Sequence, residues 1–519
     1  MAWSSEFVAF LSTSTPPSVV FTLEPYKSND GVASSLRVSS HASTGLPALI
    51  HDIPRLSGQS LDTSTFKNDI GAFALSLVDD GSGAFEEMLG TWARGMLLVL
   101  RMGFEGWDLG LFETIALGQL RSITGPGPVW AVECWDLWSA LETRQSLTAS
   151  KGTWFHGTGG ETTVAAGNAY NAADPTITVT GAAAFERETG GSYLLKVTPT
   201  SGSKFYLTAS SVASDVFTIV THGALGTTDA DAAVGNVVEE SALLDGHPLD
   251  IFRRMLTSSG AGVNGSWDDY PESWGWGLRA DFVNASEIDT WKTKVIKVSS
   301  GSYAVHWRAD AEQTNGWTWL QDRLSAHGIW PVLRQGQVSV RAAQDPTGDA
   351  WSLTNLLSDG VTITDDDIID VVSVEVWSTS KTVEYEKFKA VFSSGGSQIY
   401  TDVPATLPQV VTYTVDLTDD LTDQSTKSNV AANVKQRCGI WLTRVPERVV
   451  LLLSSLRWMG LVPGDVVSLR TRRTLLRTAT WSNLGTVQGT VVQVSPDLAR
   501  WSVQVVIEIP PPWAGQTGP

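Results

Sequence analysis

The most regular alternation of hydrophobic and polar positions lies near the end of the chain. Its polar face carries Ser502, Gln504 and Glu508, and its apolar face carries Trp501, Val503, Val505, Ile507 and Ile509. A period of two is typical of a β-strand, and the run from Val487 supplies a partner for a hairpin. We expect one face to belong to a core and the other to meet solvent or a neighbour.

The first 150 residues show several short apolar runs separated by turn residues. They predict strands over 73–78, 96–102, 109–120 and 129–134, the third of them split by Gly118.

Two short helices are predicted among these strands. Ser82 follows the turn Asp79–Gly81 and could cap a helix whose first turn holds Glu86 and Glu87. Asp136 should cap a second helix, in which Trp138 and Leu141 lie three residues apart on one face.

A stretch without tryptophan follows. The chain has 22 tryptophans, and none lies between Trp154 and Trp267. Alternating segments at 176–180, 205–208 and 216–220 are separated by Gly, Ser and Asp turns. The composition and the pattern predict an inserted small β-sandwich or barrel over residues 151–241.

Helical periodicity returns after this insertion. A helix should open at His247-Pro248, bury Leu249, Phe252 and Leu256, and stop at Gly260. A second helix should run from Asn315 to Gly328 and lead into a hairpin around Gln335-Gly336. These elements predict a small α+β domain over residues 242–360.

The remaining 159 residues, 361–519, predict mainly β-structure. Strands are expected over 369–377, 387–392 and 410–415, and a tight turn at 462–465 should feed a strand over 466–469. One helix is predicted there from the spacing of Val430, Val434 and Cys438.

Composition narrows the possible functions. A chain of 519 residues has room for three or four domains, and the net charge of −19 argues against a free nucleic-acid-binding protein. The charge is uneven, because residues 427–500 carry +8 and the rest −27; the excess could orient stacked subunits or simply be a solvated face. The start of the chain does not read as a signal peptide, and no apolar run is long enough for a membrane span.

No catalytic, cofactor or metal motif is recognisable. Cys134 and Cys438 are expected to be buried free thiols. The glycines at 81–83 match no phosphate-binding loop, and no GxSxG elbow is present. The histidines stand singly, without HxH or HExxH spacing, at His41, His51, His156, His222, His247, His306 and His327.

Three charged clusters have a structural interpretation that outweighs a functional one. Asp365-Asp-Asp367 should cap a turn rather than hold a cation, and Asp229 and Asp231 lack the later ligands of a calcium loop. A strand face or subunit contact is favoured over phosphate binding for the basic cluster of Arg470, Arg472, Arg473 and Arg477.

One segment leaves a carbohydrate-related alternative open. Between Trp267 and Trp276, Asp268, Asp269 and Glu272 lie beside three tryptophans, one of which is Trp274. A glycosidase needs two carboxylates across a sugar-lined cleft, and residues so close on one loop do not demonstrate one. The segment could also be a sugar-binding platform or a structural aromatic loop.

The order of these elements resembles that of tailed-bacteriophage tail hub, or baseplate hub, proteins. The resemblance covers most of the chain outside 151–241. It rests on the opening β unit through 96–102 and 112–123, the helix entry at 247–256, the helix and hairpin from 319 to 336, and the closing unit from 462 to 509.

The resemblance implies two tube-like β-barrel domains, at about 1–150 and 361–519, and no catalytic residues. It implies a homotrimeric hub ring in the virion that joins the sixfold distal tail protein and tail tube to a threefold tip. The tape-measure protein and tail fibre or tip proteins would be further partners, and DNA would pass through the channel without specific binding. A hexameric distal tail protein and a host-surface carbohydrate-binding tail protein are the alternatives.

Overall fold

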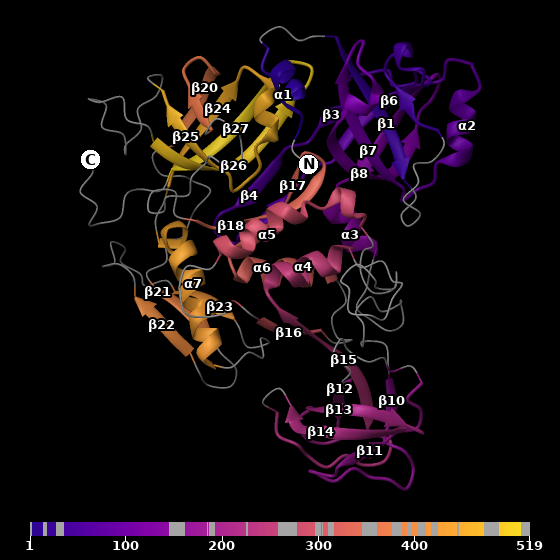
Figure 1. The fold of residues 1–519 in the computed structure, drawn as a ribbon, viewed down its shortest axis with the longest axis vertical. Coiled ribbons are helices and arrows are strands. Elements are labelled where there is room, and N and C mark those ends of the chain that lie inside the picture. Colours follow the sequence, from indigo (N-terminus) through magenta and orange to yellow (C-terminus); the bar gives the residue numbers. More distant parts are fainter. Residues whose placement is uncertain are drawn as a thin grey trace.

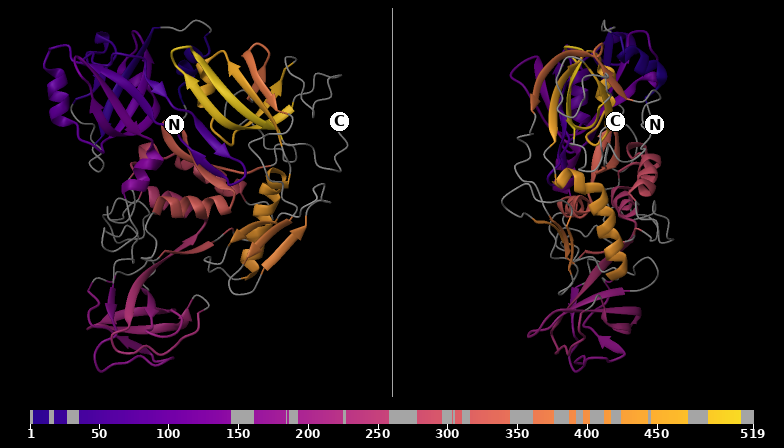
Figure 2. Two further views of the ribbon diagram at one scale, coloured as in Figure 1. Left: turned by 180° about the vertical axis from the view of Figure 1, so that it is seen from behind. Right: turned by 90° about the vertical axis from the view of Figure 1, so that its left-hand side faces the viewer.

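The computed structural model shows a mainly β chain with α+β parts, which confirms the predicted fold class. Two β units lie at one end of the molecule, a helical layer lies below them, and the tryptophan-free insertion forms the opposite end (Figures 1 and 2). The structure describes residues 3–13, 18–26, 36–144, 161–183, 185, 193–224, 227–257, 278–295, 303, 305–309, 316–344, 361–375, 387–391, 397–401, 412–416, 424–443, 446–471 and 487–509.

The front unit is the β structure formed by the first 135 residues. Its strands pair in the order β2-β1-β7-β8-β9-β6-β3. Their bounds are β1 (Val19–Tyr26), β2 (Val38–Ser39), β3 (Arg55–Leu56), β6 (Phe73–Val78), β7 (Leu97–Phe104), β8 (Glu113–Thr124) and β9 (Val129–Trp135).

Backbone hydrogen bonds close the front unit into a ring. The segment 47–51 lies between β2 and β6, because Ile50 N donates to Ser39 O (2.9 Å) and Val78 N donates to Leu49 O (2.7 Å). Ile50 also forms a bridge with Leu77. Closure leaves few open strand edges, a common protection against unwanted pairing.

Two details of the front unit differ from the sequence prediction. Gly118 does not split a strand, because β8 continues through it after a short 3-10 helix, η2 (Leu109–Leu111). The N-cap position of helix α2 (Ala84–Thr91) is Gly83 rather than Ser82, although the Ser82 hydroxyl accepts the Ala84 N–H (3.3 Å). The Asp136 prediction is confirmed, since its carboxylate accepts the Ser139 N–H (2.9 Å) at the start of α3 (Leu137–Arg144).

The insertion has a core of its own. Its sheet order is β10-β15-β12-β13-β14-β11. Its main core contains only residues between Val164 and Val238, and a second small cluster of Leu194, Tyr206 and Ala224 also lies within the insertion. The bounds are β10 (Glu161–Thr163), β11 (Thr176–Thr178), β12 (Tyr193–Thr198), β13 (Phe205–Ala213), β14 (Val216–Ala224) and β15 (Val237–Gly246).

A two-stranded stem connects the insertion to the rest of the molecule. The second half of β15 pairs with β16 (Val305–Ala309), so that this strand passes through position 241 without a break. The stem leads to helices α4 (Pro248–Thr257), α5 (Ala285–Lys294) and α6 (Gly316–Ala326) and to the hairpin β17 (Ile329–Arg334) and β18 (Gln337–Ala342).

The helical layer largely follows its prediction. Leu249, Phe252 and Leu256 are fully buried on α4, and the hairpin turns at Gln335-Gly336. The expected stop at Gly260 and cap at Asn315 lie outside the described residues. A core of these helices also includes Trp138 of α3 and Val99 of β7, which joins the layer to the front unit.

The back unit is the second large sheet, in the order β19-β25-β26-β27-β24-β20. Its edge strands β19 and β20 follow one another through the turn at 365–367, so the sheet curls back on itself. The bounds are β19 (Thr362–Thr364), β20 (Ile368–Glu375), β24 (Glu447–Leu453), β25 (Val466–Arg470), β26 (Val487–Asp497) and β27 (Ser502–Ile509).

Residues 376–446 hold a further small unit. Its strands β21 (Lys387–Val391), β22 (Ser397–Thr401) and β23 (Thr412–Asp416) form a sheet beside helix α7 (Gln424–Thr443). Val430, Val434 and Cys438 are buried on α7, as their spacing predicts.

The candidate assembly site at the junction of the two β units

The front and back units share a four-strand motif. The order β7-β8-β9-β6 of the front sheet matches the order β25-β26-β27-β24 of the back sheet, and the next strand beside β7 or β25 is β1 or β19. The last strands differ, because β2 pairs with β1 whereas β20 pairs with β24. Both units place a helix between the first two strands of the motif in chain order, α2 between β6 and β7 and η6 (Leu456–Gly460) between β24 and β25. They differ in that β1 is antiparallel to β7 whereas β19 is parallel to β25.

Details of the hydrogen bonding also repeat. In front, Gly95 N donates to Leu120 O and Leu120 N donates to Met96 O. In the back, Gly464 N donates to Val491 O and Val491 N donates to Asp465 O. A register shift follows directly after each of these strand positions, at Leu120/Ser122 on β8 and at Val491/Gln493 on β26.

Equivalent glycines allow the same close approach of strands. A Cβ on Gly118 would lie 2.9 Å from the Cβ of Cys134, and one on Gly489 would lie 2.5 Å from Cγ2 of Ile507. The two glycines occupy equivalent places, two residues before the register shifts at Leu120 and Val491. Such agreement in position and in packing indicates an internal structural repeat.

A short N-terminal helix joins the two units. Ser4 caps α1 (Ser5–Leu11) by accepting the Phe7 N–H, and Phe7 is fully buried. The carbonyl of Leu11 accepts the Ser455 hydroxyl (2.6 Å), and the Trp501 indole N–H donates to Thr13 O (2.9 Å). The first residues of the chain are therefore bonded to the back unit.

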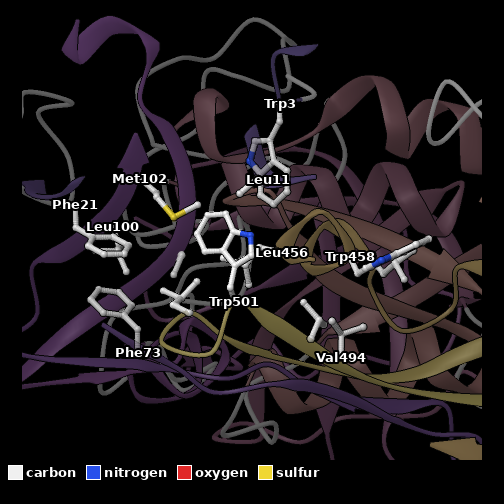
Figure 3. Packing of buried hydrophobic residues seen from close by; sticks show 14 of the residues in the cluster. Trp3, Leu11, Phe21, Phe73, Leu100, Met102, Leu456, Trp458, Val494 and Trp501 are labelled. Atoms are coloured by element: carbon white, nitrogen blue, oxygen red, sulfur yellow. The ribbon is translucent and has the colours of Figure 1, made fainter. Parts of the chain in front are cut away.

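One hydrophobic core runs through both units. Figure 3 shows Trp501 of the back unit between Met102 of the front unit and Leu456. Burial of apolar area contributes about 25 cal/mol per Å², so a shared core resists any movement of one unit against the other. The front and back units form a single block.

A hairpin of the front segment also extends the back sheet. Strand β4 (Gln59–Asp62) pairs with β26 and with β5 (Lys67–Asp69). The Thr63 hydroxyl donates to the buried Glu508 carboxylate (3.0 Å). On the polar face of β27, which was expected to meet solvent or a neighbour, Glu508 and Ser502 are thus buried within this same chain, whereas Gln504 is half-buried.

A buried ion cluster connects the helical layer to the back unit. Arg341 is fully buried between Asp465 (Nε–Oδ1 2.8 Å) and Glu287 (2.9 Å), and Arg334 also contacts Glu287 (3.0 Å). Burial alone would raise the pKa of Glu287, but the two guanidinium groups lower it to about 2. The carboxylate therefore stays charged, as a buried cation requires.

A cavity of about 780 Å³ lies beside this junction. Residues 52–56 form one wall and residues 495–504 form the other. Its charged side chains are balanced, with Asp52 and Asp497 against Arg55 and Arg500.

Burial keeps the two thiols protonated and the buried histidines neutral near pH 7. Cys134 and Cys438 are buried and free, as predicted, and burial raises the pKa of each thiol to about 12. Burial likewise lowers the pKa of His247 and His327 to about 3, so both imidazoles are neutral. His41 and His51 are exposed, whereas nothing is described of His156 or of the His306 side chain.

The acidic candidates serve turns and loops. Asp367 accepts the Thr364 N–H (2.9 Å), as predicted for a turn cap, and it pairs with Arg457. Asp229 accepts hydrogen bonds from the Tyr170 hydroxyl and from Ala173 N. Among the described residues, no group of three or more histidine, cysteine or acidic side chains could hold a metal ion.

Some predicted sites lie outside the described residues. They comprise the aromatic and acidic loop with Asp268, Asp269, Glu272, Trp274 and Trp276, and Arg472, Arg473 and Arg477 of the basic cluster. Within the described ranges, no helix is long and apolar enough to cross a membrane.

Comparisons with known proteins give weak likenesses. No protein-family model matches the chain, and no curated protein matches it. A chain of the native gene transfer agent virion is 13% identical, with a TM-score of 0.20 over 46% of this chain and 84% of that one. The 43 kDa tail protein of prophage MuSo2 from Shewanella oneidensis is 9% identical, with a TM-score of 0.33 over 95% and 99%.

A third similar structure is a chain of the lidded Francisella PdpA–VgrG complex. It is 11% identical, with a TM-score of 0.36 over 95% of this chain and 53% of that one. Scores of this size do not establish a shared fold, so the architecture of the chain itself carries the functional argument.

The internal repeat is not visible in the pattern of hydrophobic positions, but two short segments of the sequence share identical residues. Gly95-Met-Leu-Leu-Val-Leu-Arg101 and Gly464-Asp-Val-Val-Ser-Leu-Arg470 agree at glycine, leucine and arginine with the same spacing. Each segment leads into the second strand of the shared motif in chain order, β7 or β25.

Proposed function

We propose that the chain is a structural hub of a phage tail tip. One observation carries the proposal, namely the repeat of a four-strand motif in two β units that share a core. Three such chains arranged around an axis would present six similar units. A homotrimer could then match a sixfold tail tube or distal tail ring on one side and a threefold tip on the other.

The physical properties of the block suit such a ring. A shared core and the pairing of β4 with β26 would hold the two units of each chain at a fixed spacing. Ring closure depends on that spacing, because a small angular error per unit would produce an open helix instead.

The charge suits a channel that DNA crosses. A net charge of −19 disfavours phosphate binding, so DNA would pass along the acidic wall without specific contacts. The proposed partners are the distal tail protein, the tail tube, the tape-measure protein and tail fibre or tip proteins. The proposed place is the tail tip of the virion.

The proposal includes a non-enzymatic role. The unreactive thiols and neutral buried histidines of the described chain agree with it. The four-part division at residues 150, 241 and 360 also remains a proposal.

Counting copies tests the proposed function. Mass photometry of the purified chain, alone and with its distal tail partner, should show a trimer, and an averaged image of the tail tip should show three copies around the axis. Six copies would support a distal tail ring instead. A chain that stays monomeric with every tail partner would contradict the hub.

A further inference from the structure

The way in which β4 extends the back sheet reveals a strand-binding position. On one side of β26, β25 covers Val487–Thr490 and β4 covers Gln493-Val494. The opposite side is occupied by β27. Strand β4, from the front segment of the chain, therefore fills the edge that the shorter β25 leaves open.

The equivalent strand of the front unit has the same edge. On β8, β7 covers Glu113–Gln119, and β9 occupies the opposite side as far as Thr124. The register shift after Leu120 places Ser122 and Ile123 at the positions of Gln493 and Val494 in the back unit. In the part of the chain that the structure describes, no strand lies against Ser122–Thr124 on the β7 side.

The side chains at this edge are accessible. Ser122 and Ile123 are half-buried, and Thr124 is exposed. An edge of this kind presents backbone groups to a further strand, which would gain hydrogen bonds along the ladder.

We propose that Ser122–Thr124 of β8 is the docking position for a strand of a second copy of this chain. The inference rests on the proposed ring. In the ring, each front unit would lie between the back unit of its own chain and the back unit of the next copy. Within one chain, β4 of the front segment pairs with β26 of the back unit. Between copies, a strand from the back unit of the next copy would pair with β8 in the same way.

The packing around Gly58 shows how closely the docking strand approaches. A Cβ on Gly58, directly before β4, would lie 2.6 Å from Val494 O and 2.3 Å from the Ser495 hydroxyl. Thr124 occupies the place of Ser495 in the front unit. A large side chain at Thr124 should therefore exclude the incoming strand while leaving the exposed surface of the monomer intact.

Hydrogen exchange of the full chain measures the contact directly. Peptides spanning 121–127 should exchange at least about tenfold more slowly in the ring than in the monomer, because their backbone groups gain partners. Peptides spanning 491–495 should be equally slow in both states, since β4 already covers that edge.

A matched pair of variants provides a second test of the docking position. Thr124→Trp should raise the concentration needed for assembly at least about tenfold, a change equivalent to losing a few backbone hydrogen bonds. Thr218→Trp makes the same change at an exposed strand position of the insertion and should leave assembly unchanged. Circular dichroism of the two monomers checks that both variants fold.

The possible outcomes are distinct. A wild-type ring in which 121–127 exchange as fast as in the monomer would overturn the docking position and leave the hub intact. Normal assembly of Thr124→Trp would overturn it as well. If the wild-type chain never assembles, the proposed function itself fails.

Discussion

Gly95 and Gly464 occupy the same place in the two β units, and each has a positive φ, 92° and 103°. Their surroundings differ. A Cβ on Gly95 would meet only the Gln119 amide at 3.7 Å, whereas one on Gly464 would lie 2.6 Å from the Trp330 ring and 2.8 Å from Cβ of Arg341. Both positions therefore favour glycine because of their positive φ, but only at Gly464 is there also no room for a side chain.

Alanine substitutions at these two positions distinguish the cost of the backbone conformation from the cost of steric crowding. Gly95→Ala should lower the free energy of unfolding by about 1 kcal/mol, the cost of a left-handed backbone for an L-residue. Gly464→Ala should lower it by about 3 kcal/mol or more, because the methyl group also displaces buried side chains. Urea denaturation of both variants measures the difference, and equal losses would contradict this account.

The Glu287 carboxylate makes stability depend on pH. Its pKa of about 2 in the folded chain lies below the ordinary value of 4.5. The stabilisation is thus complete above pH 4.5 and is lost as the pH falls toward 2, by about 3 kcal/mol in total. Unfolding measured from pH 6 to pH 2 should show this decline.

A variant of the same cluster supplies the control. Glu287→Gln should be less stable at pH 7, because Arg341 and Arg334 lose a buried counter-charge, and it should show a smaller decline in acid. Glu86→Gln, on the exposed side of α2, should decline as the wild type does. An unchanged decline in Glu287→Gln would place the acid sensitivity elsewhere.

Among the elements, those with strong local periodicity were predicted well. The strand over 73–78 has its expected bounds, and the helix around Val430 and the hairpin at Gln335 were found because their cores have regular spacing. Local patterns also fixed the mainly β fold class.

Contacts between distant segments could not be predicted in this way. The β4–β5 hairpin has a mixed pattern, because its side chains contact three parts of the molecule. Gln59 bonds to Leu333 O (2.6 Å), Phe66 stacks on Trp330 (ring centroids 6.0 Å apart), and Thr63 bonds to Glu508. The partners of such residues are supplied by the tertiary fold, so their sequence shows no period.

The insertion should be removable as an element. Replacing residues 151–241 by a short glycine-serine linker removes a core that is separate from the other described clusters. The midpoint of thermal unfolding of the remainder should change by only a few degrees, since few packing contacts are lost. Differential scanning calorimetry measures it, and loss of the β units in the shortened chain would show that the insertion is needed for folding.

At the scale of the whole molecule, charge governs the encounter with nucleic acid. With a net charge of −19, the assembled chain should show no measurable binding to double-stranded DNA up to about 10 µM at 0.1 M salt. Fluorescence anisotropy of a labelled duplex tests this. Saturable binding that weakens steeply with salt would indicate a basic DNA-contacting surface and contradict a non-adhesive channel.

The bond between Thr63 and Glu508 spans 445 residues. A ribosome that adds about 5–20 residues per second needs roughly 20–90 s to make the second partner after the first. During that interval the strands β26 and β27 do not yet exist, so the apolar residues of the β4–β5 hairpin are exposed to solvent. Biosynthesis of this chain should therefore depend on protection of its early segment by chaperones, and slowing translation should lower the yield of soluble protein.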